Sequence, residues 1–352
     1  MPDDLPKIHR GKRNKPSDSN FCQQRLNAWR PLLTARCIYP VFILIGAVSI
    51  CLGVVLHLGA MKASELTIWY TDCLTPDKML ARSLLNFTEP EGPTCEYNII
   101  LTDNGFEGDV TFLYGMSNYY QNNRQYIRSR NDLQLFGTLD SHTDCEPDDV
   151  DKATNKTIAP CGRVANSMFN DTFSMVYHSN NGSIPVPFSA SNVIHAYERE
   201  RKYKNPPYKS LNMTLCEAFN NTVKPTWWKK PICMLGDDKT GRGFENVDFI
   251  VWMNTAPLPD FRKIYRTLNR TQTHDTTFHK GLPPGNYTLH ITYNYNVIHY
   301  NAKKSFVIAT TSWSGPKNYF LGIAYMTVGL FLFLLGCGLV VYDCINRKMK
   351  YA

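Results

Sequence analysis

The chain has 352 residues, which is about the length of two domains, and carries a formal net charge of +8. With 43% hydrophobic and 19% charged residues, it is too apolar to be intrinsically disordered. The basic excess lies at the two ends: residues 1–37 hold eight Lys or Arg against three acids, residues 343–352 hold three against one, and the residues between hold 27 against 26. No basic face is left for DNA or RNA, so we expect no nucleic-acid partner.

Two apolar runs, at residues 38–60 and 320–342, are each long enough to cross a hydrocarbon core of ~30 Å as a helix. The polar leader before the first run is too long for a cleaved signal peptide, so we predict that this span is retained. Basic residues lie outside the two runs, whereas the inner flanks carry only Lys62 and Lys317. By the positive-inside rule, residues 1–37 and 343–352 are predicted cytosolic tails, and residues 61–319 form an extracytoplasmic domain.

Cysteines and glycosylation motifs fit that orientation. Six of the 11 cysteines lie in residues 61–319, an even number that suits disulfides in an oxidising compartment: Cys73, Cys95, Cys145, Cys161, Cys216 and Cys233. Six cysteines can pair in many ways, and their spacing alone does not choose. Every Asn-x-Ser/Thr acceptor lies in the same segment, and we predict N-glycosylation there, at Asn86, Asn155, Asn170, Asn181, Asn212, Asn220, Asn269 and Asn286.

Strand patterns dominate this central segment. In chain order, β-branched or aromatic runs predict strands at residues 110–114, 173–177, 249–253 and 306–311. Apolar and polar side chains alternate from residue 287 to 296, the period of a strand with one buried face. Residues 119–130 and 259–268 predict helices instead, the second because Phe261, Ile264 and Leu268 repeat at helical spacing. We therefore predict a membrane protein with two transmembrane α-helices and a large, mainly β extracytoplasmic domain, an antiparallel β-sandwich with a few short helices.

One short motif resembles a catalytic site. Residues 238–241 read Asp-Lys-Thr-Gly, as in the loop on which P-type ATPases form their aspartyl phosphate. This chain has no large cytosolic nucleotide-binding domain, and such a run is also ordinary turn chemistry, so we interpret it as a turn. Nucleophile-elbow, zinc-protease, phosphate-loop and dinucleotide motifs are all missing from the sequence. We expect no catalytic residues, no metal and no cofactor.

Small residues repeat every seven positions in both predicted spans. They are Gly46, Gly53 and Ala60 in the first span, and Gly322, Gly329 and Gly336 in the second. Seven residues make nearly two helical turns, so each helix carries one stripe where another backbone can approach closely. Two interpretations are open. The stripes pack against a further membrane protein, which we favour slightly, or they join the two spans to each other.

Longer blocks of the sequence resemble one known family in order. They are residues 21–35 (FCQQRLNAWRPLLTA), 114–137 (YGMSNYYQNNRQYIRSRNDLQLFG), 158–171 (IAPCGRVANSMFND), 204–207 (KNPP), 243–266 (GFENVDFIVWMNTAPLPDFRKIYR), 282–297 (LPPGNYTLHITYNYNV) and 312–325 (SWSGPKNYFLGIAY). The chain resembles the cell-cycle control protein 50 / ligand-effect modulator 3 family, accessory β-subunits of type IV P-type ATPases, the phospholipid flippases. It departs from the family pattern at residues 191–201, at Asn254, and at Pro316 and Tyr319 before the second span.

The resemblance implies specific pairings and contacts. Cys73 would pair with Cys95 and Cys145 with Cys161, which leaves Cys216 for Cys233. Within the matching blocks, the candidate contacts with a partner subunit are Trp29, Tyr119, Tyr120, Arg124, Trp252, Phe261 and Arg262. Packing in the protein core is the alternative explanation for the aromatic members of this set.

The resemblance also implies a function without catalysis. The chain would be an accessory subunit of a flippase ATPase, needed for its stability, its export from the endoplasmic reticulum and its transport of aminophospholipids to the cytosolic leaflet. Its partners would be the ATPase and membrane lipids, and its location the endoplasmic reticulum, the Golgi and endosomal system or the plasma membrane. Lys348 and Lys350 resemble a dilysine retrieval signal, with positive-inside charge as an equal alternative. A free-standing glycoprotein receptor or adhesion protein is the rival hypothesis, and an ectoenzyme with unrecognised carboxylates is a weaker one.

Overall fold

The computed structural model describes residues 19–26, 34–73, 92–102, 105–179, 182–208, 213–271, 276–297 and 301–351. These residues divide into two compact units. One holds the chain up to Val55 and from Leu321 onward, and the other is Leu56–Phe320. We describe each unit by itself, beginning with the helical one.

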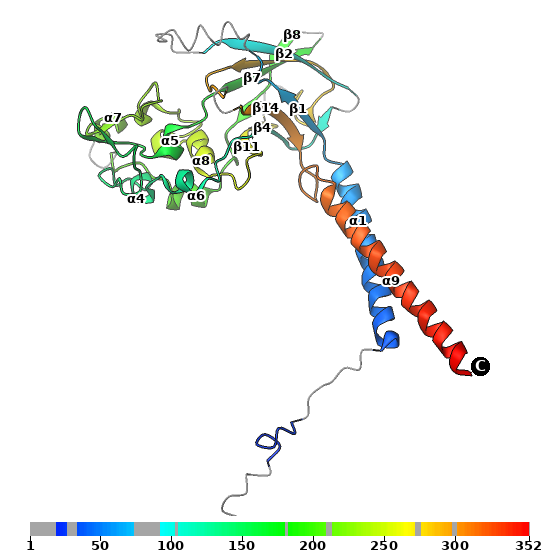
Figure 1. Ribbon diagram of the computed structural model, residues 1–352. Coiled ribbons are helices and arrows are strands. Elements are labelled where there is room, and N and C mark those ends of the chain that lie inside the picture. The colour runs from blue at the N-terminus through cyan, green and yellow to red at the C-terminus, as the bar shows by residue number, and fades with distance from the viewer. Residues whose placement is uncertain are drawn as a thin grey trace, which may run out of the picture. The chain divides into compact units, whose positions relative to one another are not determined.

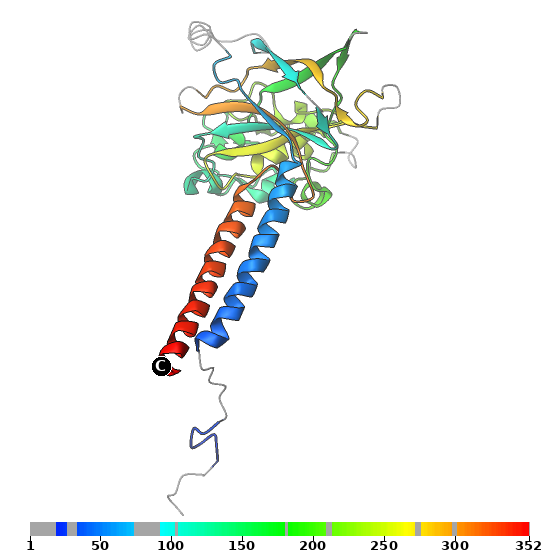
Figure 2. The same cartoon turned by 90° about the vertical axis from the view of Figure 1, so that its right-hand side faces the viewer.

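Two long helices, α1 (Ala35–Met61) and α9 (Phe320–Tyr351), lie side by side (Figure 2). The first unit contains α1 up to Val55 and α9 from Leu321. Both are long and apolar enough to cross a membrane. Glycines bring their backbones together: a methyl group added at Gly46 would lie 2.7 Å from the backbone nitrogen of Phe333 and 2.8 Å from the carbonyl oxygen of Gly329. One added at Gly53 would lie 2.9 Å from the carbonyl oxygen of Gly322. Only a residue without a Cβ fits such contacts.

The stripes of small residues therefore join the two helices to each other. Gly336 belongs to the same seam, because a methyl group there would lie 2.7 Å from the side chain of Ile43. Our slight preference for packing against a further protein is wrong for these glycines, since their open side is occupied by the neighbouring helix. Ala60 is buried in the second unit.

The second unit contains two antiparallel sheets (Figure 1). The first has the strand order β1 (Glu65–Trp69), β14 (Lys303–Thr310), β4 (Val110–Ser117), β11 (Phe261–Leu268), β9 (Phe188–Ser189), and the second has the order β2 (Thr94–Leu101), β13 (Gly285–Thr292), β7 (Thr172–Ser179), β8 (Gly182–Pro185). A small ladder pairs β3 (Phe106–Glu107) with β12 (Gly281–Leu282). The last two long strands of the chain, β13 and β14, are thus each flanked by strands on both sides.

The core lies between these two sheets. Tyr287, Leu289 and Ile291 of β13 are all at most 1% exposed, so the predicted alternation of buried and polar positions is confirmed. Across the core, the ring centroid of Phe173 on β7 lies 4.8 Å from that of Phe306 on β14. The predicted strands at residues 110–114 and 173–177 are confirmed as parts of β4 and β7, and the one at residues 306–311 is confirmed as far as Thr310, where β14 ends.

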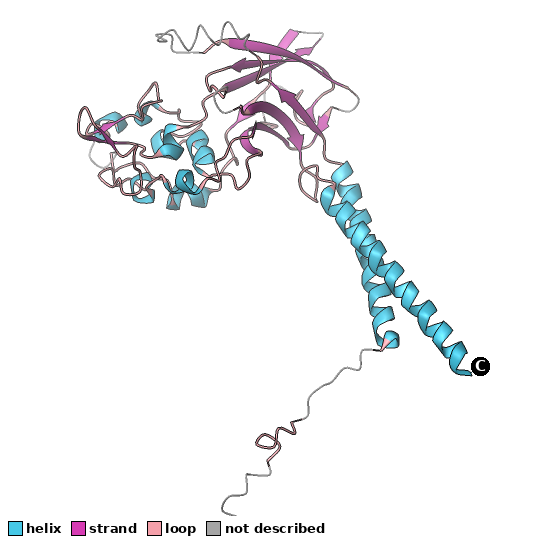
Figure 3. Cartoon of the chain, viewed as in Figure 1, coloured by secondary structure: helices cyan, strands magenta, loops and turns pink. Residues whose placement is uncertain are grey.

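Two long insertions, residues 118–171 and 190–260, form a separate lobe of short helices and loops (Figure 3). Its elements are α3 (Arg124–Arg128), α4 (Asp132–Leu135), β5 (Val150–Asp151), β6 (Lys156–Ile158), α5 (Arg163–Asn166), α6 (Ala196–Arg201), α7 (Leu215–Ala218), β10 (Thr222–Val223), η3 (Ile232–Met234), η4 (Gly243–Glu245) and α8 (Val247–Met253). A three-stranded sheet of order β10-β6-β5 joins the insertions, because β10 of the second pairs with β6 of the first. We call this part the helical lobe.

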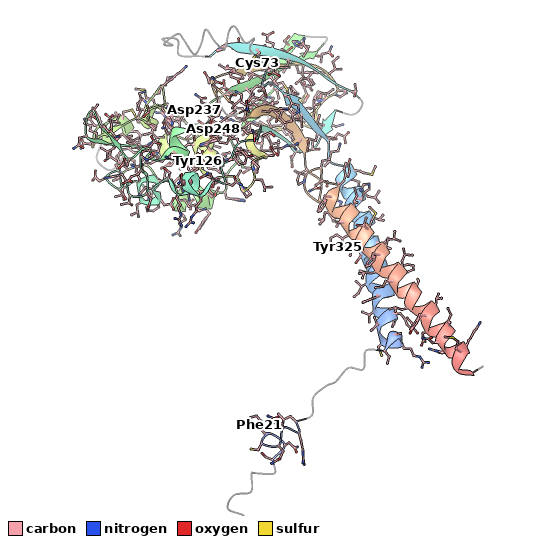
Figure 4. All side chains as sticks on the ribbon, in the orientation of Figure 1. Phe21, Cys73, Tyr126, Asp237, Asp248 and Tyr325 are labelled. Atoms are coloured by element: carbon pink, nitrogen blue, oxygen red, sulfur yellow. A yellow bond between two sulfur atoms is a disulfide. The ribbon has the colours of Figure 1, made fainter. Side chains whose placement is uncertain are left out.

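Three disulfides link near neighbours in the sequence. Cys145–Cys161 lies in the first insertion and Cys216–Cys233 in the second, with separations of 16 and 17 residues. Cys73–Cys95, with a separation of 22, connects the segment after β1 to β2, and Figure 4 labels Cys73. Cys73–Cys95 and Cys145–Cys161 are the pairs that the family resemblance implied, and Cys216–Cys233 is the pair that was left over.

Two predicted elements have the wrong type. Residues 261–268 form strand β11, not a helix, because the segment pairs with β4 on one side and β9 on the other, and this ladder overrides the helical spacing. Residues 249–253 belong to helix α8, not a strand. Four of these five residues are fully buried and Val251 is half-buried, and a short apolar run of this kind has no period that separates helix from strand. The helix predicted at residues 119–130 is confirmed only over α3.

Candidate functional site

A buried ion pair lies where β7 and β14 begin. The Lys304 Nζ is 2.5 Å from the Asp171 Oδ2, and both side chains are fully buried. Tyr70 donates its hydroxyl to the same carboxylate oxygen at 3.0 Å. The other oxygen accepts backbone N–H groups of Asn294 and Tyr295 at 2.6 Å each. Burial, and then the Asp171 charge, raise the pKa of Tyr70 well above its usual value, so this phenol stays a donor. The carboxylate fixes β14 to the segment that follows β13.

A second buried lysine joins the first sheet to the helical lobe. Lys263 extends from β11 and donates from its Nζ to the carbonyl oxygens of Val251, Trp252 and Asn254, at 3.0, 2.8 and 2.8 Å. These carbonyls belong to the last turn of α8, where the helix dipole favours a cation. Burial lowers the pKa of Lys263 to about 7. Lys263 therefore helps to hold α8 against the sheet, together with Arg266 of β11, which pairs with Asp248 of α8.

Two predicted contact residues are core residues instead. Trp252 is fully buried and donates its Nε1–H to the carbonyl of Val164 at 2.8 Å. Tyr119 is 8% exposed, and its hydroxyl lies 2.8 Å from that of Tyr295. Phe261 is half-buried, with its ring centroid 6.3 Å from that of Tyr119. For these aromatic residues the alternative of core packing holds.

The other predicted contacts lie on the surface. Tyr120 is 59% exposed, and Arg124 at the start of α3 is exposed. Arg262 is exposed as well and pairs with Glu65 of β1 at 2.8 Å. Trp29 lies outside the described residues.

Sequence reasoning missed further exposed apolar side chains of the helical lobe. They include Leu133, Phe136, Tyr197 and Leu258, which are 63, 44, 65 and 64% exposed, and also Trp227 and Met234, which are 63 and 62% exposed. Tyr197 could have been found, because it is the one apolar side chain besides Ala196 in the charged run of α6. The others occur in segments whose hydrophobic pattern does not distinguish exposed positions from buried ones.

A cavity of about 520 Å³ opens between the helical lobe and the sheets. Its walls include Trp227 and Trp228 from the lobe, Tyr265 from β11, and the Arg266–Asp248 ion pair, whose closest N–O distance is 2.5 Å. Figure 4 labels Asp248. Asn170, one of the predicted glycosylation sites, also lines it.

The predicted glycosylation sites are accessible where the structure describes them. Asn155, Asn170, Asn220 and Asn286 are exposed and Asn269 is half-buried, whereas Asn86, Asn181 and Asn212 lie outside the described residues. Their modification stays a prediction.

The Asp-Lys-Thr-Gly segment is a turn, as predicted. The Asp237 Oδ1 accepts the backbone N–H of Lys239 and of Thr240, at 3.0 and 2.7 Å, and the Thr240 hydroxyl at 2.8 Å. These bonds, those from Thr240 foremost, lower the pKa of Asp237. Asp238 points outward, with its side chain 89% exposed, and pairs with Arg242. Figure 4 labels Asp237, and the turn lies between η3 and η4 rather than between strands.

Comparisons with known proteins assign the family. Residues 56–349 match the LEM3 (ligand-effect modulator 3) family / CDC50 family. The chain belongs to this family. It is 40% identical to cell cycle control protein 50A of Bos taurus over 353 residues, covering 96% of this chain and 91% of the relative. It is 38% identical to cell cycle control protein 50B of Homo sapiens, with 94% of each chain covered.

A plant relative has a more informative name. The chain is 35% identical to the putative ALA-interacting subunit 4 of Arabidopsis thaliana, over 95% of this chain and 91% of the relative. Family membership and the two apolar helices together make this CDC50-family chain a two-span membrane protein with a large, mainly antiparallel β domain. Sequence reasoning therefore identified both the family and the fold class correctly.

Proposed function

We propose that this chain is the non-catalytic subunit of a phospholipid-translocating type IV P-type ATPase. The observation that carries the proposal is family membership over residues 56–349, together with a full-length relative whose name describes an interacting subunit. The catalytic chain would hydrolyse ATP and move aminophospholipids to the cytosolic leaflet. This chain would stabilise that ATPase and allow its export from the endoplasmic reticulum, because a partner that binds the folded state stabilises it by mass action.

The proposed topology places both tails in the cytosol and the sheet domain with its helical lobe outside it. The charge distribution supports this orientation, since the basic excess lies outside the two spans. The disulfides support it as well, because they persist in oxidising compartments. Spans at residues 38–60 and 320–342 lie within α1 and α9, which both extend further.

Such a subunit would act only through binding energy. It can favour one conformation of the ATPase over another only if its contacts differ between the two. The two buried lysines suit this role, because they hold the helical lobe and the sheets in a fixed arrangement that a partner can bind without reordering them.

Purification of the full-length chain from its native membrane in mild detergent tests the proposal. We expect a polytopic ATPase to co-purify in stoichiometric amount and to form a phosphoenzyme. An Asp238→Asn variant should leave the phosphoenzyme level unchanged, because Asp238 lies in an exposed turn. If no ATPase co-purifies and a soluble ligand is bound instead, the receptor or adhesion hypothesis replaces this one.

A further inference from the structure

The cavity between the helical lobe and the sheets has an exposed tryptophan in its wall. Trp227 lines the cavity and is 63% exposed, although tryptophan side chains are highly buried on average. Its backbone is fixed, because its N–H donates to the Asn166 Oδ1 at 3.0 Å. The next residue is fixed as well, since the Trp228 Nε1 donates to the carbonyl of Ala165 at 2.9 Å. The wall therefore offers a large apolar ring, on an anchored backbone, that the protein itself leaves mostly uncovered.

A predicted glycosylation site lies in the same wall. Asn170 lines the cavity, is exposed, and begins the acceptor sequence Asn-Asp-Thr at residues 170–172. Its carbonyl accepts a hydrogen bond from the Asn294 Nδ2 at 3.1 Å, and the residue after it belongs to the buried ion pair. Asn166, the hydrogen-bond partner of Trp227, precedes Asn170 by four residues, which span at most ~14 Å. A glycan on Asn170 would thus start from a fixed point close to the exposed indole ring.

The size and chemistry of the cavity suit sugar rings. Its volume of about 520 Å³ falls within the range of ~300–1,000 Å³ that is typical of small-molecule sites. A sugar ring presents C–H groups on its faces and hydroxyl groups around its edge, so it can pack on an aromatic ring and hydrogen-bond at its rim. Trp227 and Tyr265 supply aromatic surface in the wall. Lys229 and Lys230, both exposed, can donate to the hydroxyl oxygens.

An anionic ligand would fit the same cavity less well. Arg266, the guanidinium in its wall, is already occupied by Asp248 through two hydrogen bonds of 2.5 and 2.9 Å. Bidentate bonds from a guanidinium are the usual way to hold a carboxylate or phosphate. Apart from this pair, the cations that line the cavity in the described part of the chain are Lys229 and Lys230. Because both are exposed, water and salt screen their attraction for an anion.

We propose that this cavity binds the first sugar residues of an N-linked glycan on Asn170, with the N-acetylglucosamine ring packed against Trp227. Attachment forms a C–N bond between the Asn170 Nδ2 and the sugar, breaks the C–O bond between that sugar and the diphosphate of its lipid-linked donor, and releases one amide proton. A tethered sugar has an effective concentration on the order of millimolar, so weak contacts suffice to hold it.

The bound glycan would connect two parts of the protein. Its sugars would contact Trp227 of the helical lobe and Tyr265 of β11, and would thereby stabilise the junction between lobe and sheet. This inference rests on the proposed topology, which exposes the acceptor to the glycosylating compartment, but it does not depend on which ATPase is the partner.

Release of the glycans from the full-length chain in mild detergent tests the proposal. The probe is a glycoamidase, which hydrolyses the bond between Asn and the first sugar, and mass spectrometry of peptides follows each acceptor. We expect release from Asn170 to be about tenfold slower than from Asn155 and Asn220, because the enzyme acts only when the glycan leaves the cavity. In the denatured chain the rates should be equal. Trp227→Ala should remove most of the protection, whereas Trp313→Ala, which changes a tryptophan that is 66% exposed outside the cavity, should retain it.

Stability provides a second measurement. Thr172→Ala removes the acceptor sequence, and Thr172→Ser, which keeps it, is the matched control. We expect Thr172→Ala to lower the unfolding midpoint relative to Thr172→Ser. Adding Trp227→Ala to Thr172→Ala should lower it little further, because both changes remove the same contact.

Two kinds of failure can be told apart. Equal release rates in the folded chain, or equal loss of protection in Trp227→Ala and Trp313→Ala, would leave the cavity to a soluble ligand or a partner protein and would overturn the inference. An unmodified Asn170 in a chain that is glycosylated at Asn155 or Asn220 would overturn it as well. If none of the acceptors carries a glycan, the proposed topology fails together with the inference.

Discussion

The sandwich and the helical lobe are stabilised in different ways. In the sandwich, β13 pairs with β2 and β14 pairs with β4 over eight consecutive positions each. The helical lobe has strands of two or three residues and helices of three to seven. Buried side chains bond part of its backbone: Gln134, fully buried, accepts from the Cys161 N–H at 2.8 Å and donates to the Ile158 carbonyl at 2.9 Å.

The second insertion follows the same rule. Asn205 accepts from the Phe244 N–H and donates to the Arg242 carbonyl, both at 2.9 Å. A long ladder shares its stability among many bonds, whereas each side chain of this kind holds a loop alone. Single substitutions should therefore unfold the lobe locally. In the sandwich, a single substitution should cost much stability only where it leaves a buried charge without its partner.

The largest effect is expected from Lys304→Met in the sandwich. The change leaves the Asp171 carboxylate buried without its cation, which costs about 3–5 kcal/mol of unfolding free energy. Denaturant unfolding of the detergent-solubilised chain measures it. Lys303→Met, the exposed neighbour on β14, is the matched control. Equal midpoints for the two variants would show that the buried pair does not stabilise the sandwich.

Removing a lobe disulfide should come next. The Cys145→Ser, Cys161→Ser double variant opens a loop of 16 residues and should cost about 3 kcal/mol. Hydrogen exchange should speed up within residues 118–171 and stay slow in β13 and β14. Cys22→Ser, which removes a free thiol, serves as the control. Equally fast exchange in both regions would mean that lobe and sandwich unfold as one unit.

Lys263 tests the junction between the two regions. Lys263→Met leaves three carbonyls of α8 without their donor and should cost about 1–3 kcal/mol at neutral pH. Arg262→Met, the exposed neighbour on the same strand, controls for the change of side chain. An equal loss in both variants would remove the special role of Lys263.

The same residue predicts a pH dependence. Its folded pKa of about 7 lies below its usual value of 10.5, so between these values the unfolded chain binds a proton that the folded chain does not. The contribution of Lys263 to stability should therefore rise with pH from about 7 toward 10.5 and level off below 7. Unfolding measured at several alkaline pH values should show this rise in the unmodified chain and a flatter profile in Lys263→Met.

The smallest effect is expected at the surface of the first sheet. Arg262→Gln breaks the exposed pair with Glu65 and should cost at most about 1 kcal/mol. Because salt screens exposed charges, the difference from the unmodified chain should shrink at high ionic strength. A loss of unfolding free energy that is larger and does not depend on salt would contradict this prediction and show that the pair stabilises the sheet.

This difference between regions also explains which features the sequence could predict. The strand around Tyr287 was predictable because a ladder with one buried face imposes a period of two. Helix α8 was not, because the run from Phe249 to Met253 is short, apolar and mostly buried, and its start is set by the Asn246 side chain, which accepts from the Phe249 N–H at 3.0 Å. The blocks that identified the family include the lobe, but their local pattern does not reveal that Trp252 is buried while Tyr197 is exposed.

The order of the strands constrains how the chain is made. In each sheet an interior strand, β13 or β14, is among the last parts of the second unit to be synthesised, so neither sheet can be completed until almost all of that unit has been made. The disulfides can form earlier, because each one joins cysteines that are at most 22 residues apart. Short-range pairing would let oxidation proceed stepwise on an unfinished polypeptide, and it would limit mispaired intermediates during biogenesis.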